Sequence, residues 1–210
     1  MLSGIVVGYD PGGNGAHGFA ELRVENGEAR ALSTRTLETA EEVISIIEQM
    51  PFLTALGVDT LTCWGTGVSG WRPADHWLRN RYKPIQNSVV TPNFLSGSMG
   101  LNGMGVLIAA RRRFGDVLVT ETHPKVLYWK LSGRKYEHQT SGATMDRVLT
   151  DALGITVASE TEHEWDAAAS ALAAFEGLTG RWSHDLHALP IKAGERLITP
   201  CGTTHYFWPE

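Results

Sequence analysis

The chain has 210 residues, of which 42% are hydrophobic and 20% are charged. This length is enough for one domain with a substantial core, and the composition excludes a disordered or fibrous chain. The sequence has no apolar run as long as a membrane span, and its N-terminus lacks the basic and apolar regions of a signal peptide. We therefore expect a cytoplasmic α/β protein, a single domain over residues 1–210, with no membrane partner.

The formal net charge of −5 conceals a basic centre. Residues 64–135 hold eleven Lys or Arg against three acidic residues, a local net charge of +8, so the rest of the chain carries −13. A basic segment beside an acidic site suits an enzyme that acts on nucleic acid, whereas the alternative is that these charges are spread over a solvated surface. Cys63 and Cys201 form neither a zinc motif nor a disulfide framework, so we expect free thiols.

Strands and one helix are predicted in the first part of the chain. The chain begins with an apolar run, which is followed by two stretches on either side of an Asn-Gly turn. An amphipathic segment closed by Pro51 and a short apolar run come next. They predict strands over residues 4–10, 16–23 and 29–36, a helix over 37–50 and a strand over 52–59. The chain therefore opens with a three-strand meander.

The remaining residues combine an irregular insertion with helices. Residues 62–105 are rich in Gly, Ser, Thr, Asn, Pro and Trp, and we expect an active-site lid or a ligand-binding insertion with a short helix near 73–81. Beyond it the pattern predicts helices over residues 101–114, 123–129, 143–153 and 161–178 and a strand over 116–121. In the C-terminal extension, residues 179–210, the segments 196–199 and 205–208 are candidates for a small hairpin.

Acidic residues stand at the ends of the predicted strands. Asp10 lies between an apolar strand and the turn Pro11-Gly12-Gly13, and Asp59 and Glu121 end later strands. In an open α/β sheet, ligands bind beyond the carboxyl ends of the strands, so acids placed there can converge on one crevice. The alternative for Asp10 alone is an Asp that opens a turn by accepting a hydrogen bond from the backbone two residues on.

A fourth acid, Asp166, lies one turn inside the strongest predicted helix. Glu162 and His163 precede it by four and three residues, so all three can project from one side, and the alanines after Asp166 would let the helix lie close against a sheet. The helix dipole explains Glu162 and Glu164, but Asp166 lies too deep for that explanation. Hard oxygen ligands of this kind suit Mg²⁺ or Mn²⁺, and two such ions can promote the cleavage of a phosphodiester.

These motifs resemble those of a known family. The run Val-Val-Gly-Tyr-Asp10-Pro-Gly-Gly is similar to the first acidic motif of RNase H-like folds, including the G-x-D-P-G of RuvC-type junction resolvases. Leu-Gly-Val-Asp59, Val-Thr-Glu121-Thr-His-Pro and Glu-Trp-Asp166-Ala-Ala-Ala-Ser-Ala-Leu resemble the successive motifs of the family called domain of unknown function 429, which comprises predicted RNase H-like nucleases. The resemblance covers about residues 4–178.

The resemblance implies an RNase H-like fold, with a central mixed five-stranded sheet flanked by helices. It also implies a metal-dependent nuclease that hydrolyses nucleic-acid phosphodiester bonds with two Mg²⁺ or Mn²⁺ ions. By position, Asp10 would bridge both ions, Asp59 would ligate one, and Asp166 would complete the other. Glu121 matches the acid of the fifth strand, and His123 would orient the scissile phosphate or carry a proton.

Candidate contacts for a nucleic acid, DNA or RNA, lie in the basic centre. Arg111, Arg112 and Arg113 could grip phosphates, and Trp64 and Trp71 could stack on bases. The alternatives are a solvated helix face for the arginines and a cap on the core for the tryptophans. A homodimer is one assembly that the sequence leaves open.

Two other functions fit parts of the pattern. Actin-like phosphotransferases also place an Asp before a glycine-rich turn, here Gly12-Gly13-Asn14-Gly15, although the sequence offers no second phosphate loop. A non-catalytic domain would keep the fold and use the insertion to hold a ligand or partner. The residues that follow Asp59, Thr60-Leu61-Thr62-Cys63-Trp64, favour this reading, because members of the family more often have a small residue and Pro there.

Overall fold

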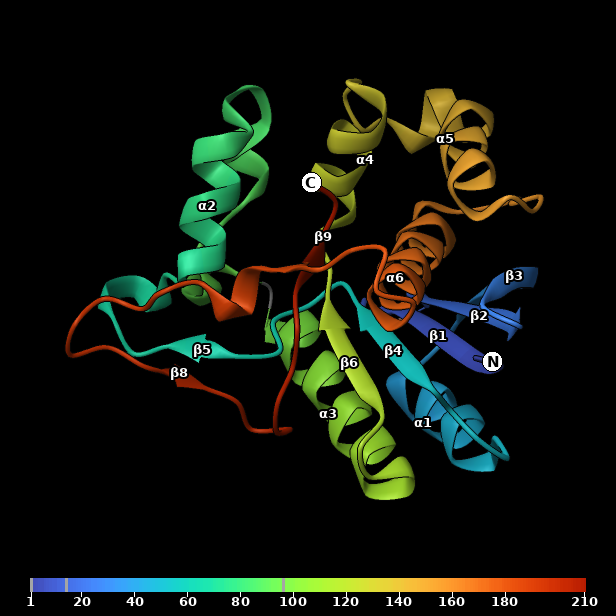
Figure 1. Ribbon diagram of the computed structural model, residues 1–210, viewed down its shortest axis with the longest axis horizontal. Helices are drawn as coiled ribbons and strands as arrows, with labels where there is room; N and C mark the ends of the chain where they lie inside the picture. Colours follow the sequence, from blue (N-terminus) through green and yellow to red (C-terminus); the bar gives the residue numbers. More distant parts are fainter. Residues whose placement is uncertain (1, 14, 96) are drawn as a thin grey trace.

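A five-stranded mixed sheet lies at the centre of the computed structural model, which describes residues 2–13, 15–95 and 97–210 (Figure 1). In sheet order its strands are β3 (Glu28–Leu37), β2 (His17–Glu25), β1 (Gly4–Asp10), β4 (Ala55–Val58) and β6 (Leu118–Glu121). The first three strands of the chain pair antiparallel, whereas β4 runs parallel to β1 and β6 parallel to β4. This strand order confirms the predicted α/β class and RNase H-like fold. Asn14, part of the glycine turn considered for phosphate binding, lies outside the described residues.

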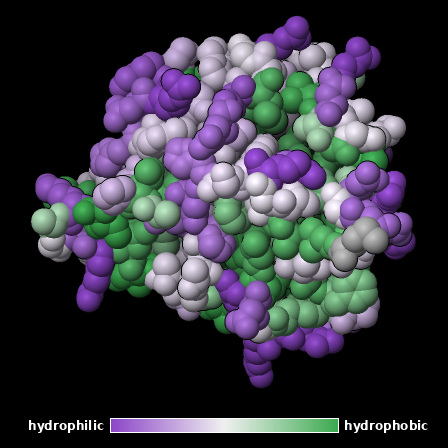
Figure 2. All heavy atoms as spheres, in the orientation of Figure 1, coloured by the Kyte–Doolittle hydropathy of each residue, from purple (hydrophilic) through white to green (hydrophobic). Residues whose placement is uncertain are grey.

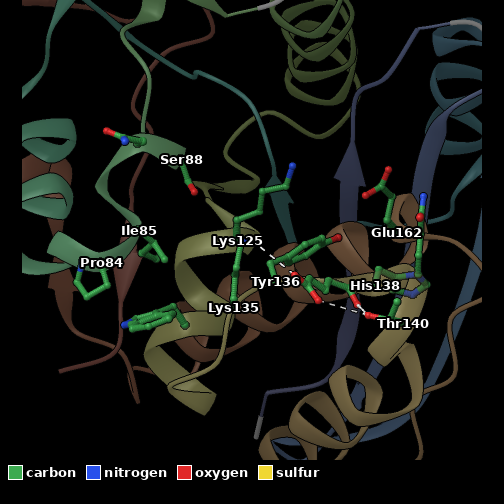
Figure 3. Close-up of a pocket in the computed structure, with 13 residues that line it drawn as sticks. Pro84, Ile85, Ser88, Lys125, Lys135, Tyr136, His138, Thr140 and Glu162 are labelled. Carbon is green, nitrogen blue, oxygen red and sulfur yellow. Dashed lines mark hydrogen bonds and ion pairs between the residues drawn. The ribbon is translucent and has the colours of Figure 1, made fainter.

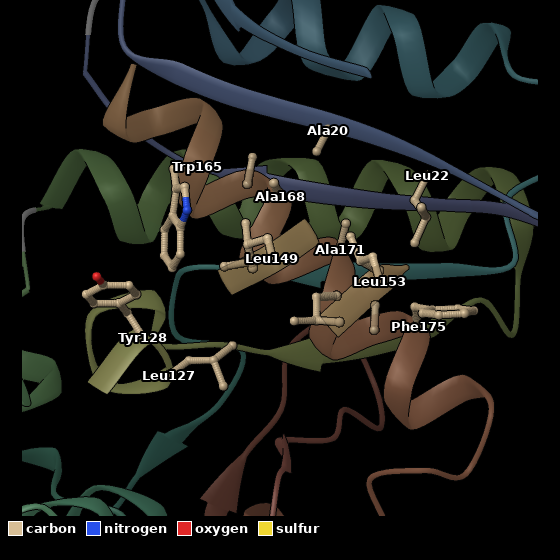
Figure 4. Packing of buried hydrophobic residues seen from close by; sticks show 14 of the residues in the cluster. Ala20, Leu22, Leu127, Tyr128, Leu149, Leu153, Trp165, Ala168, Ala171 and Phe175 are labelled. Atoms are coloured by element: carbon tan, nitrogen blue, oxygen red, sulfur yellow. The ribbon is translucent and has the colours of Figure 1, made fainter. Parts of the chain in front are cut away.

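Helices cover both faces of the sheet. α1 (Ala40–Gln49) and α3 (Gly97–Phe114) pack on one face, and α4 (Pro124–Ser132), α5 (His138–Leu153) and α6 (Glu162–Leu178) pack on the other (Figure 1). Each face of the sheet has its own hydrophobic core, because successive side chains of β1 point to opposite faces. Val6 belongs to the core on the α6 side, and Val7 and Tyr9 belong to the core on the α1 side. Figure 4 shows the α6 side, where Trp165 and Ala168 lie among side chains of α4 and α5.

Glycines on the strands let α6 rest directly on the sheet. A Cβ atom at Gly8 of β1 would lie 1.9 Å from the backbone oxygen of Ala167, and one at Gly57 of β4 would lie 1.9 Å from that of Ser170. No larger residue fits at these positions, so the backbone of the helix approaches the backbone of the strands. The first turns of α6 are thereby held over the carboxyl ends of β1 and β4.

The insertion is built from short elements. It contains β5 (Trp64–Gly65), η1 (Val68–Gly70), α2 (Pro73–Arg81), η2 (Lys83–Ser88) and η3 (Pro92–Phe94). α2 confirms the predicted short helix. α3 begins at Gly97, earlier than the predicted residue 101, while Ser96 lies outside the described residues.

The predicted C-terminal hairpin is wrong. β8 (Leu197–Ile198) pairs with β5 of the insertion, and β9 (Phe207–Trp208) pairs with β7 (His184–Asp185), which η4 (Leu186–Ala188) follows. Between β8 and β9, the backbone of His205 donates to Val119 and accepts from Glu121. The segment therefore covers the edge of β6 and satisfies backbone groups there, a distant pairing that a local turn pattern does not reveal.

The surface mixes polar and apolar side chains. In the orientation of Figure 1, hydrophobic areas are interrupted by hydrophilic residues (Figure 2). Within the described residues, no helix combines the length and the apolar character needed to cross a bilayer.

Candidate metal centre

Asp10, Asp59 and Asp166 meet at the carboxyl ends of β1 and β4. One carboxylate oxygen of each lies within 4.8 Å of those of the other two. Because Tyr9 pairs with Val58 in the parallel register, the next residues of the two strands, Asp10 and Asp59, come side by side. α6, resting on the strand glycines, contributes Asp166. Three separate elements thus supply oxygen atoms close enough for one coordination shell.

The three carboxylates are held in an unfavourable electrostatic environment. Burial raises the pKa of each of them, and the neighbouring carboxylates raise the pKa values of Asp59 and Asp166 further. No hydrogen-bond donor among the described residues reaches the carboxylate of Asp59, which is partly exposed, whereas Asp10 and Asp166 are buried. A divalent cation would offset the excess negative charge.

Three further side chains contact or face these acids, and the sequence analysis did not assign them a role. His163 Nδ1 lies 2.7 Å from Asp10 Oδ2, and this hydrogen bond raises the pKa of His163. The Tyr136 hydroxyl donates to Asp166 Oδ1 at 2.9 Å. The ammonium of Lys125 lowers the pKa values of all three acids. The spacing of His163 and Asp166 was a usable signal, whereas nothing in the sequence marked Tyr136.

Glu121 does not join the three acids within the described part of the chain. Arg72 donates from Nη1 to Oε2 at 2.7 Å and from Nη2 to Oε1 at 2.6 Å, and it also pairs with Asp75. The backbone N–H of Thr62 donates to Oε2 at 2.9 Å. Although burial raises the pKa of Glu121, the charges and hydrogen bonds of Arg72 and His187 together outweigh this effect and hold that pKa well below its usual range. Both oxygens of Glu121 are therefore already engaged.

Cys63 and His187 extend this second cluster. Their ligand atoms and one oxygen of Glu121 lie within 4.8 Å of one another, but the guanidinium of Arg72 is 3.6 Å from Cys63 Sγ and already supplies positive charge. Burial lowers the pKa of His187, yet its contacts with Cys63 and Glu121 raise it to about 10. Cys63 and Cys201 are free thiols, as expected.

His123 is the residue just before α4, and its side chain makes no capping hydrogen bond to that helix. Its Nε2 atom lies 3.0 Å from the backbone oxygen of Ser88 in η2, and its Nδ1 atom is buried without a partner among the described residues. Burial lowers the pKa of His123, so the ring is neutral near pH 7. His123 lines a cavity together with Asp59.

The structure does not place the predicted arginine contacts beside the acids. Arg111 donates to the backbone oxygens of Gly115, at 3.3 Å, and of Thr203. Arg113 donates to the backbone oxygen of Glu48 at 3.2 Å. These contacts lie at the C-terminal end of α3, whereas the N-terminal part of that helix is the end nearer the acids. Arg112 is exposed on the same distal turn.

At that nearer end, Asn102 of α3 donates to the backbone oxygen of Gly12 at 2.9 Å, two residues after Asp10.

The predicted stacking residues lie in the insertion. Trp64 is 37% exposed, and its Nε1 atom donates to Asn93 at 3.4 Å. Trp71 stacks on His76, with the guanidinium of Arg79 5.3 Å from its ring centre. Both rings already have partners within the insertion.

Comparison with known proteins adds two solved structures. No family model and no curated protein matches the chain. The Thermus thermophilus RuvC structure is 18% identical, with a TM-score of 0.47 over 85% of this chain and 96% of that one. T. thermophilus RuvC in complex with Holliday junction substrate is 17% identical, with a TM-score of 0.46 over 84% of this chain and 94% of that one. The assignment of the fold rests on the strand order itself.

Proposed function

We propose that this protein is a metal-dependent nuclease that hydrolyses phosphodiester bonds of DNA or RNA. Asp10, Asp59 and Asp166 are its proposed metal ligands and catalytic acids, and Mg²⁺ or Mn²⁺, as a pair of ions, is the proposed cofactor. The observation that carries the proposal is the convergence of these three carboxylates from β1, β4 and α6.

The donor set fits such a cofactor. All three groups offer oxygen, which Mg²⁺ and Mn²⁺ prefer over the nitrogen and sulfur that suit zinc. When bound, a pair of these ions activates a water molecule and stabilises the leaving oxygen of a phosphodiester. The raised pKa values of the acids also support a cation site, because acidic groups held close together at a cost in stability are typical of functional sites.

The surrounding residues have proposed roles of their own. His163 holds the carboxylate of Asp10, and Tyr136 holds that of Asp166, so both act as positioning residues. The exposed ammonium of Lys125 is suited to a substrate phosphate. His123, as a neutral imidazole, remains the proposed group for proton transfer. We further propose, on the motifs alone, that the chain belongs to the domain of unknown function 429 family.

Cleavage assays with labelled single-stranded and double-stranded DNA and RNA test the proposal. We expect cleavage that needs Mg²⁺ or Mn²⁺, stops with EDTA and disappears in Asp10→Asn. Asp151→Asn is the matched control, because Asp151 is an exposed residue of α5 that contributes nothing to the acid group. Cleavage that persists in Asp10→Asn would overturn the proposal.

A further inference from the structure

Two cavities flank the three acids and share part of their walls. The larger, of about 750 Å³, lies between η2 and the region that joins α4 to α5 (Figure 3). The smaller, of about 210 Å³, lies beneath the insertion and is lined by Asp59. Ser88 and Lys125 line both cavities. Tyr136 lines the larger one and donates to Asp166. Asp59 therefore lines one cavity, Asp166 is hydrogen-bonded to a residue that lines the other, and Lys125, which lies close enough to lower the pKa values of all three acids, belongs to the wall that the cavities share.

We propose that the substrate is a single-stranded nucleic acid whose unpaired nucleotides enter the two cavities, with the phosphate between them at the three acids. This inference rests on the proposed function and adds the substrate class to it. A strand that occupies both cavities has to cross the shared wall of Lys125 and Ser88, and the ammonium of Lys125 is the group there that interacts with all three acids. The ammonium of Lys125 would then face the phosphate that joins the two nucleotides.

The larger cavity has the chemistry of a nucleotide site. Its volume falls within the range of about 300–1,000 Å³ that is usual for small-molecule sites. Pro84 and Ile85 form one wall, and His138 stands on the opposite side (Figure 3). The half-buried ring of Trp129 also lines this cavity, and an aromatic ring of this kind can stack on any base. The side-chain amide of Asn87 can bond to the edge of a base.

Part of the wall that the insertion gives to the smaller cavity is apolar, beside the ion pair of Arg72 and Asp75. Val89, Val90, Leu95 and Met99 line it there, and its volume is below the usual range for a whole ligand. This side suits the flat face of one base, while Asp59 and Lys125 lie on the side of the backbone.

Paired nucleic acid does not fit this arrangement. In a duplex each base is stacked and paired inside the double helix, so neighbouring bases cannot enter two separate protein cavities. Proteins that hold individual bases in pockets act on unpaired strands or extrude the base at a cost. The two cavities therefore favour an unpaired strand over a duplex or a four-way junction.

Binding measurements with Ca²⁺, another ion that takes oxygen ligands, test this inference. Fluorescence anisotropy would compare a short labelled single strand, its duplex, and a four-way junction built from the same sequence. We expect the wild-type protein to bind the single strand at least about tenfold more tightly than the duplex, a difference that stacking on one or two bases can supply. Equal or tighter binding of the duplex or the junction would overturn the inference.

A pair of matched variants links the preference to the cavities. Val90→Trp fills the smaller cavity from a side chain that is 47% exposed. Val68→Trp is its control in the same insertion, since Val68 is 88% exposed and lines neither cavity. We expect Val90→Trp to lose about tenfold in single-strand affinity and Val68→Trp to keep it, with Mn²⁺ binding unchanged in both. An unchanged single-strand affinity in folded Val90→Trp would contradict the inference.

The two proposals fail separately. Metal-dependent cleavage of duplexes or junctions without preference for single strands would leave the proposed function standing and overturn this inference. A preference for single strands that depends on Val90, found together with no metal-dependent cleavage of any substrate, would overturn the proposed function. The inference that the two cavities bind unpaired nucleotides would then still stand.

Discussion

Replacing Gly8 by alanine should push α6 away from the sheet. The new Cβ atom would lie 1.9 Å from the backbone oxygen of Ala167 and 2.6 Å from the backbone nitrogen of Ala171. Since carbon–oxygen contacts are comfortable at about 3.3 Å, the helix or the strand has to move by about 1.4 Å. Overpacking a tight core costs about 1–3 kcal/mol. We expect a loss near 3 kcal/mol, because both partners are backbone and no side chain can turn aside.

The same displacement should weaken metal binding, because α6 carries Asp166 while β1 carries Asp10. Misplacing the support of a metal ligand typically lowers affinity by about 10–100-fold. Urea unfolding followed by circular dichroism gives the stability, and calorimetric titration with Mn²⁺ gives the affinity. Gly105→Ala is the control, because Gly105 lies in α3 with nothing within 4 Å of its added Cβ, and it should gain up to about 1 kcal/mol. A stability of Gly8→Ala within about 0.5 kcal/mol of the wild type would refute the reasoning.

Two further predictions concern the buried cluster around Arg72. Glu121→Gln leaves the Arg72 guanidinium with one carboxylate partner instead of two and should cost about 3 kcal/mol in urea unfolding; wild-type stability would show that the ion pair contributes nothing. The pKa of His187 is raised to about 10, above its unfolded value of about 6.5. Its contribution to stability is therefore fully present below pH 6.5 and lost as the pH rises towards 10. Between pH 6.5 and 10, the unfolding free energy of the wild type should fall more steeply with pH than that of His187→Asn. The same pH dependence in both proteins would contradict the raised pKa of His187.

The fold was largely predictable because its signals are local. The Asn-Gly turn specifies the first hairpin, and Asn26 and Gly27 both adopt positive φ, 55° and 80°, as a tight two-residue turn requires. The apolar run before Asp10 and the alanines after Asp166 mark the strand and the helix that carry these acids. Strand register then brings Asp10 beside Asp59, a consequence of parallel pairing that the sequence order already suggested.

The remaining features depend on contacts between distant parts of the chain. Glu121 ends a strand as Asp10 does, but Arg72 of the insertion reaches it, and no periodicity predicts such a partner. Arg111 and Arg113 form a conspicuous basic run, yet they donate to nearby backbone oxygens at the far end of α3. Tyr136 comes to Asp166 only through the packing of the segment between α4 and α5 against α6.

Calorimetric titration of Mn²⁺ into the metal-free protein tests the central claim most directly, since that claim is that three acids from separate elements form one cation site. We expect saturable binding in the wild type and in Asp151→Asn, and its loss in Asp59→Asn and Asp166→Asn. Binding that is absent from the wild type, or unchanged when Asp59 or Asp166 is replaced, would contradict it.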